Sequence, residues 1–404
     1  MVTFLIILSI ALAVLAVGQL MRVFEATSKL RGDVSPLPTD AENKYQSRMM
    51  IVLMLSYFGF FIWLMARYGG HLLPISASEH GETLDTLLNF NFWIIILVFF
   101  ITHIYLFYFA FKYVFSADRK AYYYTHSNKL ELLWTLVPAA FLAVIIVYGL
   151  SSWIDITGEA PKGSLTIELY PKQFDWTARY AGSDTTLGAS NYNMISATNP
   201  LGLITKGSLE QMTAEVKAEI AELQEAYDAA PEGGLAKEEL EEKIAKKNRQ
   251  LDRINSFGSL DAASLAGGDD DILVKSEFVI PRGKEVSFKF RSRDVIHSAY
   301  MPHFRAQMNC VPGMVTSFHF KPTITTAEMK EITQKDDFEY ILLCNKICGA
   351  AHYNMQMTIK VVEPEEFNKW MAEQKTFAES IAPADETTAV KAEENGNEIS
   401  MIAQ

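Results

Sequence analysis

The sequence predicts a multi-domain membrane protein in which transmembrane α-helical hairpins precede an all-β barrel that carries an inserted antiparallel helical hairpin. Three observations predict this architecture. Nearly all the long apolar runs lie within the first 153 residues. From Ser164 onward, short alternating runs rich in Val, Ile, Phe and Tyr are typical of β-strands. Between Gly182 and Asp271 the apolar residues instead recur at spacings of three and four, which is the helical period.

Four apolar runs predict four membrane spans. Residues 1–21 lack a basic amino-terminal region and a small-residue cleavage motif, so we expect a retained helix rather than a signal peptide. The runs Met49–Tyr68, Phe92–Phe115 and Leu132–Trp153 are each about as long as the roughly 20 residues that span a bilayer core. Pro138 lies in the first two turns of the last run, where a proline is tolerated because early helical amides lack intrahelical acceptors.

Basic residues between the spans predict the orientation of the chain. Five lysines and arginines lie in residues 22–48 and three in residues 116–130, whereas residues 69–90 have none. Cytoplasmic loops of membrane proteins carry an excess of these residues. The alternation therefore places the amino terminus and everything after Trp153 on the periplasmic side of a lipid bilayer, which we expect to be a bacterial inner membrane.

Charge and cysteine content exclude several classes of protein. The formal net charge of −12 argues against nucleic-acid binding and favours a cationic partner. Three cysteines are too few for a disulfide framework. The sequence also contains no C-x-x-C-H motif, so a covalently attached haem c is not expected.

The run C-N-K-I-C-G-A-A-H-Y-N-M, from Cys344 to Met355, predicts a metal-binding loop. Its two thiolates, one imidazole and one thioether are soft ligands that favour copper. A single blue-copper site needs one thiolate, so the second cysteine, Cys348, indicates two coppers bridged by two sulfurs. His297, in D-V-I-H-S, is a candidate for a further imidazole ligand. A Cys344–Cys348 disulfide is the alternative, but it would leave His297, His352 and Met355 unexplained.

Residues 91–182 and 271–363 resemble cytochrome c oxidase subunit II, through the metal loop, D-V-I-H-S and the run T-H-S-N-K-L-E-L-L-W-T-L-V-P from Thr125. The fold that the resemblance implies for the soluble part is cupredoxin-like. The organisation expected along the chain is two extra transmembrane helices (1–68), the transmembrane hairpin of the family (69–153), the periplasmic CuA domain (154–182 and 271–363), an inserted helical hairpin (183–270) and a tail whose composition predicts disorder (364–404).

The resemblance also implies the identity of the copper ligands. In the family, a dinuclear centre called CuA takes its bridging thiolates from positions that match Cys344 and Cys348. Its imidazoles match His297 and His352. The weak axial ligands match the Met355 sulfur and the backbone carbonyl of Lys346.

Residues near the metal loop are expected to support it. Asp294 and Ser298, which lie close to His297 in sequence, are candidates to orient its ring through hydrogen bonds. Cys310 is expected to be a buried apolar residue without a metal role. His319, in a strand-like run, is expected to be a packed or surface residue.

The insertion is expected to be a pair of amphipathic helices. Ser208 and Gln211 predict a capping box at the start of the first helix. The first arm is acidic and the second is rich in lysine, so antiparallel pairing would bring opposite charges together. We expect a contact arm for another subunit or a donor complex, with a solubilising surface decoration as the alternative. The expected apolar faces are Met212, Val216, Ile220, Leu223 and Tyr227 in one helix, and Leu240, Ile244, Leu251 and Ile254 in the other.

Three residues are expected to act in electron or proton transfer. The family glutamate that matches Glu131 lies at the mouth of a proton path into subunit I, although Glu131 could equally complement a helix dipole. The family motif Q-W-x-W, whose first tryptophan receives electrons, corresponds here to Q-F-D-W. Phe174 therefore stands at the electron-receiving position and Trp176 follows. This departure predicts a docking patch for a different donor, such as a cytochrome held within a supercomplex.

A magnesium ion of the family is expected to be absent. The positions that match its carboxylate ligands are Lys346 and Asn309 in this sequence. Magnesium prefers carboxylate and water oxygens, whereas these side chains offer an ammonium and an amide. The alternative is that the ion persists on ligands from subunit I alone.

The resemblance implies electron transfer in a haem-copper oxidase. The CuA centre would accept electrons from a periplasmic c-type cytochrome and pass them to haem in subunit I, where O2 is reduced to water with proton translocation. Subunit I and other membrane subunits would be partners, and His103, a polar residue in mid-span, is expected to face another helix or subunit. The alternatives are the CuA-bearing subunit of a nitric oxide reductase and a membrane-anchored structural or copper-delivery protein.

Overall fold

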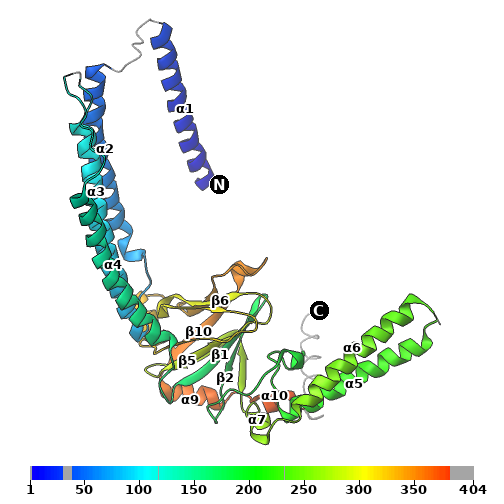
Figure 1. Ribbon diagram of the computed structural model, residues 1–404. Coiled ribbons are helices and arrows are strands. Elements are labelled where there is room, and N and C mark those ends of the chain that lie inside the picture. Colours follow the sequence, from blue (N-terminus) through cyan, green and yellow to red (C-terminus); the bar gives the residue numbers. More distant parts are fainter. Residues whose placement is uncertain (1, 31–38, 117, 232, 383–404) are drawn as a thin grey trace, which may run out of the picture. The chain divides into compact units, whose positions relative to one another are not determined.

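The computed structural model describes residues 2–30, 39–116, 118–231 and 233–382 (Figure 1). Two compact units divide the chain, Met1–Leu73 with Phe90–Ala139 and Pro74–Asn89 with Ala140–Gln404. The second unit thus combines the soluble part with the start of one long helix and the end of the next.

Four helices in the described part of the chain are long and apolar enough to cross a membrane, as the sequence predicts. Polar residues extend the first helix at its end, the second and third at their start and the fourth at both ends, but the third ends at Lys112, before the predicted Phe115. At the start of α2, for example, the Thr39 hydroxyl accepts a hydrogen bond from the Glu42 amide and forms a capping box. The four helices are α1 (Val2–Leu30), α2 (Asp40–Tyr68), α3 (Glu79–Lys112) and α4 (Asn128–Thr157).

Aromatic side chains pack α2 against α3 in the first unit. The rings of Phe58 and Phe100 lie 4.7 Å apart, and those of Tyr57 and Phe99 lie 5.7 Å apart. His103 places its ring 5.7 Å from that of Tyr57, and its Nδ1 lies 2.8 Å from the Phe99 carbonyl. The prediction that His103 faces another helix is confirmed.

Two five-stranded sheets form the soluble domain, with strand orders β3-β2-β1-β5-β8 and β4-β10-β9-β6-β7. Alternating side chains from both sheets fill the core between them, for example Phe278 of β4 and Phe288 of β5, whose rings lie 6.2 Å apart. The strands are β1 (Leu165–Lys172), β2 (Asp175–Tyr180), β3 (Ile272–Lys275), β4 (Glu277–Pro281), β5 (Val286–Phe290), β6 (His297–Met301), β7 (Ala306–Cys310), β8 (Thr316–Phe320), β9 (Tyr340–Cys344) and β10 (Gln356–Val362).

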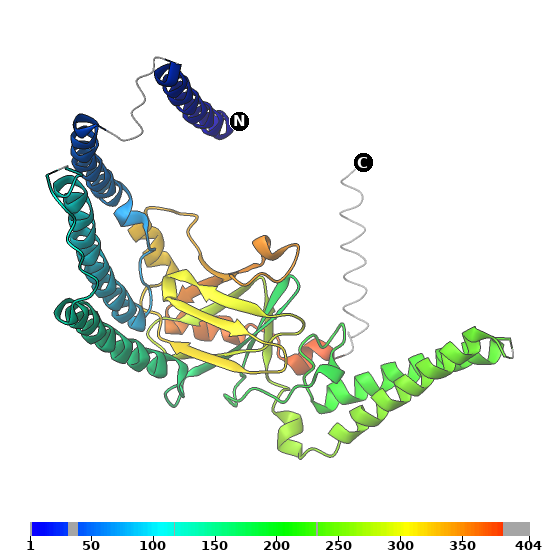
Figure 2. The ribbon, with the colours of Figure 1, turned by 45° about the horizontal axis from the view of Figure 1, so that its top comes forward.

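The insertion contains the expected helical pair, α5 (Lys206–Ala229) and α6 (Leu235–Phe257), followed by the short α7 (Ala262–Ala266). Both views show α5 and α6 side by side along their length (Figures 1 and 2). Met212, Val216 and Ile254 are buried between them, so these members of the predicted apolar faces are confirmed.

The predicted cap of the first inserted helix is wrong. Thr205 is the N-cap, and its hydroxyl accepts from the Ser208 amide while the Ser208 hydroxyl accepts from the Thr205 amide. Gln211 instead donates to Glu215, one turn further along. Ser208 fills the third helical position, where a capping box usually has Glu or Gln, so the S-x-x-Q pattern indicates the wrong pair of residues.

A buried ionic network joins the insertion to the barrel. Arg179 of β2 contacts Glu168 of β1 at 2.7 Å and Asp271 at 3.1 Å, and all three side chains are at most 3 % exposed. The Asp271 carboxylate also accepts from the Gly188 amide, whose carbonyl accepts from Arg179. Both ends of the insertion therefore meet at one guanidinium.

The prediction of disorder for residues 364–404 is wrong for its first half. Residues 364–382 form α9 (Pro364–Ala372) and α10 (Phe377–Ile381), which bury Phe367 and Phe377. Trp370, Met371 and Ile381 pack beside these two rings, so a few apolar residues hold the segment although their spacing gives little periodicity. Residues 383–404 lie outside the described residues. A further helix, α8 (Thr326–Thr333), precedes β9.

Candidate metal centre

Two neighbouring strands bring the predicted ligands together. His297 is the first residue of β6, and Cys344 is the last residue of β9. The strands are antiparallel neighbours, with Ala299 opposite Cys344, so the two ligand residues meet at the same edge of the sheet. The chain then turns through the metal loop, and His352 begins a short 3₁₀ helix, η4 (His352–Asn354), just before β10.

The two loop sulfurs lie side by side without a bond. Cys344 Sγ and Cys348 Sγ are 3.8 Å apart, and both thiols are free and buried. A disulfide would require about 2.05 Å, so the structure does not have the alternative bond. The His297 Nδ1 atom lies 3.8 Å from Cys344 Sγ, and the His352 Nδ1 atom lies 3.5 Å from Cys348 Sγ.

Each of the two predicted weak ligands lies beside a different sulfur of the pair. The Lys346 carbonyl oxygen is 3.2 Å from Cys344 Sγ, and the Met355 sulfur is 3.8 Å from Cys348 Sγ. The ligand atoms of His297, Cys344 and Cys348 lie within 4.8 Å of one another, closely enough to hold a metal ion. The structure thus brings all six predicted ligands to one place.

Asp294 orients the His297 ring. Its carboxylate contacts His297 Nε2 at 2.9 Å, which leaves Nδ1 directed at the sulfur pair. It also accepts from the Gln173 amide at 2.7 Å. Burial raises the pKa of Asp294, but the hydrogen bonds from His297, Gln173 and Val295 outweigh it and lower the pKa overall. The other candidate, Ser298, donates to the Met308 carbonyl instead.

The surroundings of the sulfurs suit a bound cation. Burial, and then the neighbouring Cys344, raises the pKa of Cys348 to about 11. Without a cation, this thiol would therefore stay protonated near neutral pH. A metal ion stabilises the thiolate directly, so the residues fit a soft metal that supplies the missing positive charge.

The β1–β2 turn packs against the metal loop. The Gln173 side chain donates to the Cys348 carbonyl at 2.5 Å. Gly349 has φ +142°, and a Cβ there would lie 2.7 Å from the Phe174 ring. Phe174 therefore contacts the loop, whereas Trp176 is 1 % exposed and lies behind His297, with 6.4 Å between ring centroids. No sequence pattern indicates the role of Gln173, since its contact joins residues 175 positions apart.

Comparison with known proteins identifies the family. Residues 66–151 match the transmembrane domain of cytochrome c oxidase subunit II, and residues 255–362 match its periplasmic domain. An alternative cytochrome c oxidase subunit 2 from Bradyrhizobium diazoefficiens is 28 % identical over 75 % of this chain and 83 % of its own length. A cytochrome c oxidase subunit 2 from Thermostichus vulcanus is 22 % identical over 79 % and 84 %.

The chain belongs to the cytochrome c oxidase subunit II family. It is therefore a membrane-bound component of an oxidoreductase complex, with subunit I as a partner and its carboxyl-terminal domain in the periplasm. The matched periplasmic domain is the one that binds CuA, and the cluster of His297, Cys344 and Cys348 agrees with that. These matches support the oxidase rather than the nitric oxide reductase.

A solved structure of the family was also found. The crystal structure of the periplasmic domain of cytochrome oxidase subunit II (CoxB) from Bradyrhizobium japonicum is 18 % identical and covers 53 % of this chain and 95 % of that one. The TM-score is 0.27, so the family assignment rests on the sequence matches alone.

Glu131 lies in the first turn of α4 and is exposed. Its carboxylate accepts a hydrogen bond from the Ser127 amide at 3.0 Å, while the Leu130 amide donates to the Ser127 hydroxyl at 3.4 Å. This arrangement satisfies two amides at the positive end of the helix, as the helix-dipole interpretation requires.

Proposed function

We propose that this chain accepts electrons for a proton-translocating cytochrome c oxidase, at a dinuclear CuA centre held by its metal loop. When bound, the copper pair supplies a one-electron acceptor that passes electrons toward haem in subunit I, where O2 is reduced to water. The observation that carries the proposal is the pair of buried sulfurs, 3.8 Å apart, with one imidazole nitrogen beside each. The proposed ligands are His297, Cys344, the Lys346 carbonyl, Cys348, His352 and Met355.

The protein would hold these ligands in one arrangement. Hydrogen bonds from strand neighbours fix the backbone at His297 and Cys344, and the Asp294 carboxylate fixes the His297 ring. His297, Cys348 and Met355 are at most 4 % exposed, so water is excluded from most of the centre. A rigid and dry ligand frame lowers the rearrangement that accompanies each gain or loss of an electron.

A cysteine comparison tests the site. We expect Cys344→Ser or Cys348→Ser to abolish the dinuclear centre, because a hydroxyl neither ionises near neutral pH nor bridges soft copper. Cys310→Ala is the matched control, since Cys310 is equally buried and lies opposite His297 on β7. Copper content and the optical spectrum of the purified complex are the measurements. An unchanged purple-copper spectrum in either serine variant would contradict the proposed ligands.

We propose further that the donor is a c-type cytochrome held within a respiratory supercomplex, and that it docks on an apolar surface. Ile347 and Tyr353, both on the metal loop, are 87 % and 88 % exposed. Phe174 packs against the same loop at Gly349. Trp176, which is buried, would act only from behind His297.

The salt dependence of reduction tests the apolar surface. We expect Tyr353→Ser to slow electron uptake from the native membranes, and the exposed Tyr123→Ser to leave it unchanged, because Tyr123 lies in the loop between α3 and α4, whose basic residues predict the cytoplasmic side. Soluble mitochondrial-type cytochrome c should be a poor donor. Rapid reduction by that protein with a steep dependence on ionic strength would contradict this surface, because screening weakens contacts between charges.

Two other roles remain proposals. Glu131 would admit protons toward subunit I, which Glu131→Gln tests: it should lower the protons translocated per electron, whereas a capping role alone would leave that ratio unchanged. The pair α5 and α6 would be a contact arm for another subunit or the donor complex. A photo-crosslinker at Leu235, which is 79 % exposed, should then capture a neighbouring protein in the intact membrane.

A further inference from the structure

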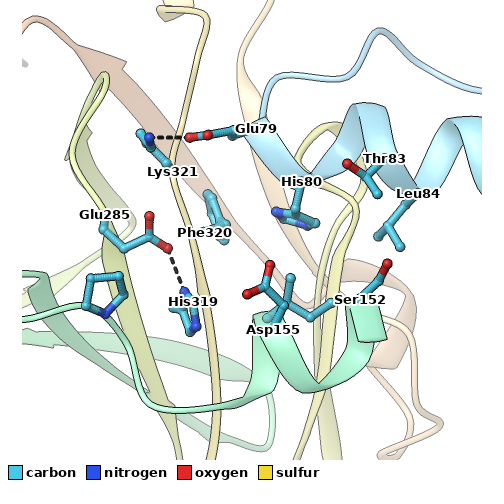
Figure 3. Close-up of a pocket in the computed structure, with 12 residues that line it drawn as sticks. Glu79, His80, Thr83, Leu84, Ser152, Asp155, Glu285, His319, Phe320 and Lys321 are labelled. Carbon is cyan, nitrogen blue, oxygen red and sulfur yellow. Dashed lines mark hydrogen bonds and ion pairs between the residues drawn. The ribbon is translucent and has the colours of Figure 1, made fainter. Parts of the chain in front are cut away.

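A polar cavity lies apart from the metal loop, within the second compact unit (Figure 3). It has a volume of about 320 Å3. Its walls come from the first two turns of α3, the last turns of α4 and the loop after it, Glu285 just before β5, and the end of β8. The lining includes His80, Asp155, Glu285, His319 and Lys321.

His319 of β8 lines the cavity, and one of its ring nitrogens has no hydrogen-bond partner among the described residues. Its Nδ1 contacts the Glu285 carboxylate at 2.6 Å, whereas its Nε2 is buried without a hydrogen-bond partner among the described residues. A carboxylate that accepts from one ring nitrogen leaves the lone pair on the other. This pairing is the usual support of a histidine that binds a metal ion.

His80 of α3 is the second available imidazole. Neither of its ring nitrogens has a hydrogen-bond partner of ordinary geometry within the described chain, although the Arg305 backbone is near. Buried polar atoms normally have a partner. The ring lies within electrostatic range of His319, Glu285 and Asp155, and Figure 3 shows it turned toward the same space as Asp155 of α4.

We propose that His80, Asp155 and His319 bind a divalent transition-metal ion of the zinc class, with Glu285 as the residue that orients His319. Imidazole nitrogens with a carboxylate oxygen suit zinc, whereas magnesium and calcium prefer oxygen ligands alone. The charges of the cavity also favour a cation, because its lysine, Lys321, is already paired with Glu79. Two carboxylates then remain in the cavity to neutralise a divalent cation.

The ion would join three separate elements. His80 is on α3, Asp155 on α4 and His319 on β8, so one coordination sphere ties the ends of two membrane helices to the barrel. Among the described residues, only His297, Cys344 and Cys348 already have their ligand atoms within 4.8 Å of one another. Binding in the cavity therefore needs closure by a side chain such as Asp155, which is exposed, and water to complete the coordination.

Zinc uptake by the purified, copper-loaded complex tests the proposal. After equilibration with Zn²⁺ and removal of free ions, we expect wild type to retain one more zinc per chain than His80→Ala, His319→Ala or Asp155→Asn. Asp155→Asn is isosteric at an exposed site, so it should fold normally, and retained copper checks this. His126→Ala, which removes an exposed histidine on the α3–α4 loop, is the control and should keep the extra zinc.

The ligands can be identified by X-ray absorption at the zinc edge. The proposal predicts nitrogen and oxygen neighbours at about 2.0–2.2 Å. Sulfur neighbours at about 2.3 Å would place the ion in the metal loop and overturn the proposal. Equal zinc retention in wild type and the three cavity variants would overturn it as well.

Discussion

Replacing Gly349 with alanine should disrupt the metal loop through a contact that the structure makes explicit. The residue has φ +142°, and an added Cβ would lie 2.7 Å from Phe174 and 2.9 Å from Gln173. Backbone strain of this kind costs roughly 1–3 kcal/mol, and overpacking adds about 1–3 kcal/mol. The expected loss is therefore about 2–6 kcal/mol, a large share of the roughly 5–15 kcal/mol that stabilises a domain.

A variant at a second glycine separates the cost of backbone strain from the cost of overpacking. Gly283 has φ +73°, and a Cβ there would meet no atom of the described chain within 4 Å, so Gly283→Ala measures backbone strain alone. Thermal unfolding and copper retention should show Gly349→Ala to be the more damaging change by about 1–3 kcal/mol. Truncation of the ring in the Gly349→Ala, Phe174→Ala double variant should recover part of that difference. If Gly349→Ala is no worse than Gly283→Ala, the packing of Phe174 on the loop is refuted.

Three other predictions follow from named residues. Met355→Leu should shift the redox potential while copper stays bound, because an axial thioether tunes more than it holds; loss of all copper on metal analysis would contradict this. Burial raises the pKa of Asp271 to about 7 despite Arg179, so the folded state keeps this proton between pH of about 4 and 7 and the ion pair with Arg179 forms only above that window. The group's contribution to stability is then full below that window and is lost as pH rises through it; unfolding curves for Asp271→Asn should lack this slope, and an unchanged slope would count against it. Finally, with Lys346 and Asn309 in place of carboxylates, manganese-substituted resonance spectra should show no stoichiometric ion beside the copper centre, and a bound Mn²⁺ there would refute the expectation.

The proposed metal ligands could be predicted from sequence because most of them share one short loop, and the resemblance to the family implied the full set. Five of the six lie between Cys344 and Met355, and a loop of this length necessarily keeps its ligand atoms close. Only His297 is distant, and it was a candidate because it follows a strand-like run and precedes an expected turn, whereas the structure makes it the first residue of β6. The four spans were equally accessible, since each is a continuous apolar run.

Other features depend on tertiary contacts that no local pattern contains. The run I-L-V-K-S-E-F-V-I has the composition of a single strand, but it divides into β3 and β4 at Ser276, which has φ +72° and sends the chain from one sheet to the other. The contact of Gln173 with the metal loop joins distant residues. The helix α10 is fixed by Phe377, a single buried ring in a polar segment.

Copper counting combined with electron paramagnetic resonance tests the central claim most directly. The purified, oxidised complex should hold two coppers bound to this chain, with one unpaired electron shared equally by both nuclei in the hyperfine pattern. That signal should disappear in Cys348→Ser and persist in Cys310→Ala. A single copper with the spectrum of an isolated Cu²⁺ ion, or a dinuclear signal that survives loss of Cys348, would contradict the account.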